Sequence, residues 1–164
     1  MNYDEFITTK KTKFVASGFE CGALPDGLFD YQADIVRWSC KLGKAAIFAD
    51  TGLGKTAMQC AWADQVAQHT GKPVLILAPL CVAQQTVKEA GKFGIDVRYL
   101  REPADTYPSI VITNYERVEK FNPNEFSGIV LDESSIIKSH TSKTRQILIN
   151  RPGRTTTFIN APHD

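Results

Sequence analysis

Short apolar runs alternate along the chain with stretches of helical periodicity. The runs cover residues 45–49, 74–78, 110–113 and 129–131, with a weaker run at 97–100 and a last candidate at 156–159. They are nearly continuous rather than interrupted by polar positions, which is typical of strands buried on both faces of a parallel sheet. The pattern therefore predicts a mostly parallel central sheet that is covered by helices.

The intervening stretches predict the helices. The first begins at Asp30, and its apolar positions recur at helical spacing until Gly43, which is well placed to end it. Further helices are expected at about 55–69, 82–92, 115–120 and 142–150. Because strands that alternate with helices indicate βαβ units, the predicted fold class is α/β.

Length and the N-terminal pattern predict the domain organisation. The 164 residues suit one domain, which would bury about 70% of the surface of its unfolded chain. Residues 1–28 are mixed in character and end in a loop that contains glycine and proline. We expect this segment to be a peripheral lead-in and residues 29–164 to form the folded domain.

Composition and charge narrow the class of protein. Apolar residues make up 43% and charged residues 23%, values of an ordinary globular protein that argue against a disordered or fibrous chain. The net charge of +1 excludes a strongly basic chain as a whole, although a basic face remains compatible with it.

The four cysteines form no C-x-x-C pair, which favours buried thiols over a zinc or redox site. No long apolar run and no secretory signal is visible, so we expect no membrane association and a cytoplasmic location.

The clearest chemical motif follows the first predicted strand, where residues 49–56 read ADTGLGKT. Glycines let the backbone wrap closely around a triphosphate, and the N-terminus of the next helix adds partial positive charge. Lys55 would reach the β and γ phosphates, and the Thr56 hydroxyl would coordinate Mg²⁺. The nucleotide-binding residues expected here are Thr51, Gly52, Leu53, Gly54, Lys55 and Thr56. Ala49 replaces the first glycine of the strict motif. The alternative is a glycine turn that only connects a strand to a helix and binds no phosphate.

Two acids, Asp132 and Glu133, end the strand predicted at 129–131. Ligands of open α/β sheets bind at the carboxyl ends of the strands. A site that hydrolyses phosphate needs one carboxylate to hold the metal, usually through water, and another to orient the attacking water. We therefore predict Lys55, Asp132 and Glu133 as catalytic residues, and Thr56 and Asp132 as metal ligands. An acid pair alone is more often a solvated turn, but the phosphate loop upstream favours the catalytic interpretation.

Together these motifs resemble superfamily 2 helicases and translocases, especially the Swi/Snf-like branch and its compact phage-type members. The resemblance covers about residues 29–164 and is strongest at 49–56 and at the DESS sequence of 132–135, which Lys138 follows. It implies a RecA-like P-loop fold, a three-layer sandwich around a mostly parallel sheet. The chain would correspond to the first of the two RecA-like lobes of the family, in a bacterial or phage-infected cell.

Other segments are similar to further motifs of the family. Gln32, in the sequence FDYQ of 29–32, would hydrogen-bond the adenine edge, because an amide presents a donor and an acceptor together. An exposed helical turn with Asp30 as its N-cap is the alternative for that segment. The resemblance also implies nucleic-acid contacts, for which strand-to-helix loops and a solvated basic face are the alternatives. These contacts would be made by Pro79, Gln85, Thr113, Asn114 and Lys138.

Two departures from the family bear on activity. The third motif of the family, a Thr-Ala-Thr-Pro-like turn, is matched only in its final part by residues 161–164, and this motif is thought to couple nucleotide state to nucleic-acid contact. No second lobe follows in this sequence, and in the family that lobe supplies an arginine finger, which can be worth about 10³–10⁵ in rate. We therefore expect weak hydrolysis by this chain alone and a second RecA-like lobe as a partner, in cis or in trans.

The sequence thus predicts the ATP-binding lobe of a DNA-dependent ATPase that uses ATP and Mg²⁺. Paired with a second lobe, it would move on DNA, with duplex DNA favoured and RNA as an alternative. Two other interpretations stay open. One is a non-enzymatic module that binds nucleotide or DNA, and the other is an unrelated P-loop NTPase.

Overall fold

The computed structural model describes residues 15–50, 52–133 and 155–160. Within these ranges the sheet has six strands in the order β1-β6-β5-β2-β4-β3, and every pair is parallel. The strands are β1 (Lys44–Phe48), β2 (Val74–Ala78), β3 (Val97–Tyr99), β4 (Ile110–Asn114), β5 (Gly128–Asp132) and β6 (Thr155–Asn160). Each predicted strand is present, and the parallel pairing confirms the α/β fold class.

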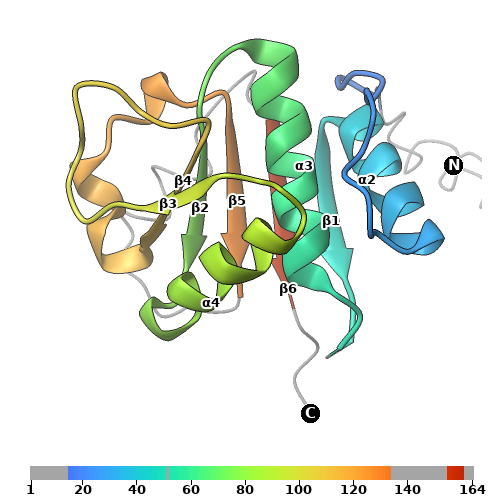
Figure 1. Cartoon of the computed structure of the whole chain (residues 1–164). Coiled ribbons are helices and arrows are strands. Elements are labelled where there is room, and N and C mark those ends of the chain that lie inside the picture. The colour runs from blue at the N-terminus through green and yellow to red at the C-terminus, as the bar shows by residue number, and fades with distance from the viewer. Residues whose placement is uncertain (1–14, 51, 134–154, 161–164) are drawn as a thin grey trace, which may run out of the picture.

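One face of the sheet is covered by α2 (Asp30–Leu42), α3 (Lys55–Thr70) and α4 (Leu80–Lys92). Figure 1 shows α3 running along the middle of the sheet, with α2 beside β1. Along β2, Val74 and Ile76 pack into the core under these helices, whereas Leu75 packs into the core on the opposite face, as the alternation of a strand requires. None of the helices in the described ranges is long and apolar enough to cross a lipid bilayer.

The opposite face carries η1 (Tyr115–Lys120) and η2 (Pro123–Glu125), two 3₁₀-helices between β4 and β5. The helix predicted at 115–120 is therefore present but is not an α-helix. After η1 the chain returns to the core on this face of the sheet, where Phe121 is buried. A 3₁₀-helix is common in such short connecting segments. The helix predicted at 142–150 lies outside the described residues.

Residues 15–28, which we call the N-terminal strap, contain no helix or strand but are fastened to two helices. The backbone N–H groups of Gly18 and Phe19 donate to carbonyls near the C-terminus of α2, at 3.2 and 3.0 Å. The side chain of Gln65 on α3 accepts from Gly22 N at 2.8 Å and donates to Ala23 O at 2.9 Å. The strap therefore packs on the helical layer and connects α2 to α3.

Candidate functional site

The phosphate loop joins the carboxyl end of β1 to the first residue of α3. Gly52 and Gly54 have φ values of 84° and 73°, so both lie in the left-handed region that favours glycine. Gly54 is also the residue that precedes α3, and it turns the chain directly into Lys55 and Thr56. The N–H groups of the first helical turn, which have no partner within the helix, are thereby presented at this edge. Thr51 lies outside the described residues.

The Lys55 side chain folds back across the loop. Its Nζ atom donates to the backbone carbonyl of Ala49 at 3.1 Å, which places the ammonium group beside the end of β1. The same charge acts on Asp132, where it favours the ionised carboxylate. Lys55 is the first residue of α3 and Asp132 is the last residue of β5, so both lie at the carboxyl edge of the sheet although they are distant in sequence.

The acid pair lies where the sequence predicts it. Asp132 is the last residue of β5, and its side chain is buried, with 6% of the residue exposed. Burial raises the pKa of its carboxyl group, and a hydrogen bond from Gln59 opposes that rise. Glu133 has a φ of 53°, an uncommon value for a residue with a side chain, so the chain turns sharply directly after Asp132.

Gln59 is a site residue that sequence reasoning missed. It lies on α3 one turn after Lys55, is fully buried, and donates from Nε2 to Asp132 Oδ2 at 3.3 Å. The available signal was a glutamine among apolar residues on a helix that follows a phosphate loop. Spacing along the helix could not show that its partner would be a carboxylate from β5.

Gln32 and Tyr31 fasten the start of α2 to the phosphate loop. The Gln32 Nε2 atom and the Tyr31 hydroxyl each donate to the carbonyl of Leu53 at 3.2 Å. The Oε1 atom of Gln32 accepts from the backbone N–H of Phe29 at 3.0 Å and so also caps the helix. The alternative for this segment, an exposed turn with Asp30 as its N-cap, is not what the structure shows, because Phe29 precedes the helix and the buried Gln32 caps it. The adenine contact of Gln32 stays a prediction.

A cavity of about 370 Å³ opens beside this contact. It lies between α2, the end of β1 and the phosphate loop, and its walls are mostly apolar. The lining residues are Tyr31, Ile35, Ile47, Phe48, Ala49, Asp50, Leu53 and Met58. A space of this kind suits a flat aromatic group better than a charged one.

The residues predicted to contact nucleic acid differ in accessibility. Gln85 on α4 is exposed and donates to Glu89 at 3.1 Å, and Pro79 precedes α4 at the edge of the sheet. The Thr113 side chain is fully buried, so in this conformation it offers no surface to a nucleic acid. Lys138 lies outside the described residues. The contacts of Pro79, Gln85 and Thr113 stay predictions.

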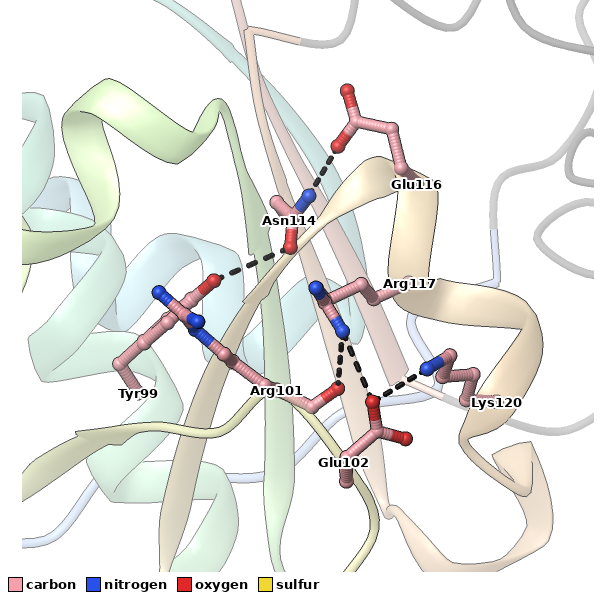
Figure 2. Close-up of polar contacts among 7 residues, drawn as sticks. All are labelled: Tyr99, Arg101, Glu102, Asn114, Glu116, Arg117 and Lys120. Atoms are coloured by element: carbon pink, nitrogen blue, oxygen red, sulfur yellow. Dashed lines mark hydrogen bonds and ion pairs between the residues drawn. The ribbon is translucent and has the colours of Figure 1, made fainter.

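Asn114 is held between two neighbours, as Figure 2 shows. Its amide nitrogen donates to the Glu116 carboxylate, and its oxygen accepts from the Tyr99 hydroxyl at 3.4 Å. With 6% of the residue exposed, Asn114 has its amide committed to these contacts. A nucleic acid would have to displace Tyr99 or Glu116 to use that amide fully.

A separate ionic cluster lies next to Asn114. Arg117 and Lys120 of η1 both donate to Glu102, which lies in the loop after β3 (Figure 2). The hydrogen bond from Lys120, more than the charge of Arg117, holds the pKa of Glu102 below its usual value. Because Glu102 already neutralises part of their charge, these two cations would attract an anion less strongly than unpaired cations would.

Tyr115 connects the segment of Asn114 to the acid pair. It is buried, and its hydroxyl donates to the backbone carbonyl of Asp132 at 2.5 Å. Burial is the main cause that raises the pKa of this hydroxyl, and the charges of Asp132 and Glu133 add to the rise. The hydroxyl therefore stays a donor at neutral pH and anchors the backbone at the turn after β5.

Replacing Tyr115 with phenylalanine is expected to lower the free energy of unfolding by about 1–2 kcal/mol, because it removes a buried hydrogen bond. Chemical denaturation with urea measures this change. The matched control is Tyr99→Phe, which removes only a long hydrogen bond of a half-buried residue and should cost less than about 1 kcal/mol. Equal losses in the two variants would contradict the anchoring role.

Comparisons with known proteins place this geometry in a fold group. No protein-family model and no curated protein matches the chain. Among solved structures, the chain is similar to the SWI2/SNF2 ATPase core of Sulfolobus solfataricus in complex with dsDNA, with a TM-score of 0.63 and 21% identity over 87% of this chain and 33% of that chain. The ATPase core domain from the same organism gives a TM-score of 0.66 and 20% identity over 93% of this chain and 34% of that chain.

A phage protein extends the likeness. The UvsW helicase from Bacteriophage T4 matches with a TM-score of 0.66 and 14% identity, over 98% of this chain and 60% of that chain. The chain thus spans between a third and three fifths of the proteins it resembles. At these identities the likeness establishes the fold, and it confirms at that level the resemblance that the motifs indicate. The chain has the RecA-like fold found in SWI2/SNF2 ATPase cores and in the UvsW helicase.

Proposed function

We propose that this chain binds ATP with Mg²⁺ as one lobe of a DNA-dependent ATPase of the superfamily 2 type. One observation carries the proposal. Lys55 at the end of the phosphate loop and Asp132 at the end of β5 both lie at the carboxyl edge of the sheet, on either side of β6. A loop built to bind phosphate and a buried carboxylate are the two parts that phosphoryl transfer to water requires.

The roles follow from the chemistry of the side chains. Lys55 neutralises the β and γ phosphates, Glu133 orients the attacking water, and Gln32 together with the adjacent cavity selects adenine. Gly52, Leu53 and Gly54 bring backbone N–H groups to the phosphates.

The residues present fit a magnesium ion. The described residues contain no cluster of three or more histidine, cysteine or acidic side chains that could hold a metal alone. Mg²⁺ is usually bound by one or two carboxylates together with substrate phosphates, so such a cluster is not needed. Thr56 and Asp132 would hold the ion, which neutralises the charge that develops on the phosphates.

The action on DNA depends on more than this chain. The solved complex of a SWI2/SNF2 ATPase core with dsDNA supports duplex DNA as the partner. Since the chain spans about a third of that protein, movement along DNA would require a second RecA-like lobe, in cis or in trans. That lobe would complete the site when the two close on the nucleotide.

Binding of a fluorescent ATP analogue and ATP turnover, each with and without duplex DNA, single-stranded DNA and RNA, test the proposal. Lys55→Ala should weaken binding about 10–100-fold, because a hydrogen bond to a charged group contributes roughly 1.5–3 kcal/mol. Lys72→Ala is the control, since Lys72 is exposed and precedes β2 at the opposite edge. Binding that Lys55→Ala leaves unchanged would refute the proposal. ATP turnover that no nucleic acid alters would favour an unrelated P-loop NTPase.

A further inference from the structure

Gln59 is a polar residue in a position that apolar residues otherwise fill. Its neighbours along α3, Met58, Cys60 and Trp62, are fully buried in the core beneath the helices. Burying an amide costs free energy unless both its donor and its acceptor find partners. Only the donor of Gln59 finds one in the described part of the chain, because Oε1 is buried there without a hydrogen bond.

The contact with Asp132 fixes the orientation of the amide. An ionised carboxylate can only accept hydrogen bonds, so the NH₂ group must face Asp132 Oδ2, which it reaches at 3.3 Å. The carbonyl oxygen of the same amide is then turned away from Oδ2 but stays near the carboxylate. A half-satisfied buried amide beside a buried acid is costly for stability alone.

We propose that Gln59 is a positioning residue for the magnesium site, which holds the Asp132 carboxylate in its binding orientation and offers Oε1 to a water of the hydrated ion. This inference rests on the proposed function. The Asp132 carboxylate also accepts from the backbone N–H of Glu133, and its remaining lone pairs are available to the metal. A water of the hydrated ion would donate to the buried Oε1 atom of Gln59. The NH₂ group would then be satisfied by Asp132 and the carbonyl oxygen by that water.

The test is a magnesium titration of the binding of a fluorescent ATP analogue to the full chain. Gln59→Met keeps the length and volume of the side chain but removes donor and acceptor. It should raise the Mg²⁺ concentration at half-saturation about tenfold, since residues that orient metal ligands typically contribute 10–100-fold. The affinity at saturating Mg²⁺ should change by less than about twofold, because no contact with the nucleotide is lost.

The matched control lies on the same helix. Gln65 is also buried, with 2% exposed, but its amide bonds to Gly22 and Ala23 of the N-terminal strap. Gln65→Met should lower the melting temperature and leave the magnesium midpoint unchanged. Gln59→Asn is the second variant, because it retains an amide that is too short to reach Asp132 and should reproduce the shift even if Gln59→Met folds poorly.

The outcomes separate the inference from the function on which it rests. Wild-type binding that depends on Mg²⁺, with equal midpoints in wild type and both Gln59 variants, would overturn the inference alone. An equal shift in Gln65→Met would also overturn it, since a loosened helix would then explain the effect. A wild-type chain that binds no ATP analogue at any Mg²⁺ concentration would overturn the proposed function itself.

Discussion

Replacing Gly54 with alanine is expected to lower the free energy of unfolding by about 2–5 kcal/mol. The φ of 73° at this position costs a residue with a Cβ atom about 1–2 kcal/mol. A Cβ atom at Gly54 would also lie 2.2 Å from Gln32 Nε2, so the amide must move. Gln32 is nearly fully buried, and its lost hydrogen bonds to Leu53 and Phe29 contribute a further 1–3 kcal/mol, roughly.

The same substitution should weaken nucleotide binding. Moving Gln32 releases the Leu53 carbonyl, so the loop loses the contacts that hold its backbone N–H groups in position. Each 1.4 kcal/mol or so of distortion reduces affinity about tenfold, and we expect at least that loss for Gly54→Ala. Thermal denaturation and titration with a fluorescent ATP analogue measure the two effects.

Gly52→Ala is the matched control for this experiment. Gly52 has a similar φ of 84°, but a Cβ atom there would meet nothing within 4 Å. The free energy of unfolding of Gly52→Ala should therefore fall only by the cost of the left-handed conformation, about 1–2 kcal/mol. If the two alanine variants are equally stable, the contact between Gln32 and the phosphate loop does not contribute to stability.

The parts of the fold that could be predicted from the sequence depend on local patterns. Each strand is a short apolar run, and the phosphate loop is a contiguous motif whose glycines must take positive φ values. Asp132 and Lys55 could be placed at one edge because parallel strands share the direction of their carboxyl ends. These inferences need no knowledge of which side chains meet.

The contacts that could not be predicted join residues distant in sequence. Gln59 meets Asp132, Tyr115 meets its carbonyl, and Gln32 meets the Leu53 carbonyl. Each pairing depends on the position of one element along another when they pack, and the periodicity of apolar residues does not determine that position. The 3₁₀ form of residues 115–120 could not be predicted for a related reason. A short amphipathic segment has the same residue pattern in an α-helix as in a 3₁₀-helix.

The N-terminal strap shows a further limit of the sequence. The sequence predicts only a loop around Gly18, because a close approach between two backbone segments leaves no signal in the local pattern of residues. Its Cα lies so near the end of α2 that an added Cβ would be 1.7 Å from Cys40 O and 2.7 Å from Lys41 O. Only a residue without a side chain fits there.

Gly18→Ala is accordingly expected to lower the free energy of unfolding by about 3 kcal/mol or more. The atoms it meets belong to the backbone and cannot rotate away, so the strap must lift and lose the hydrogen bonds that Gly18 N and Phe19 N donate to α2. For a chain of this size, the loss corresponds to a fall in melting temperature of roughly 6–12 °C. Differential scanning calorimetry measures this fall in melting temperature directly.

Gly22→Ala, in the same strap, separates this clash from the general effect of adding a methyl group. A Cβ atom at Gly22 would lie 3.6 Å from Gln65 Oε1, which is an ordinary contact. Because alanine restricts the unfolded chain more than glycine does, this variant should match or exceed the wild type by up to about 1 kcal/mol. A Gly18→Ala variant as stable as Gly22→Ala would mean that the strap does not bind α2 in solution. A strap that does bind ties α2, whose first turn holds the phosphate loop through Gln32, to the C-terminal half of α3.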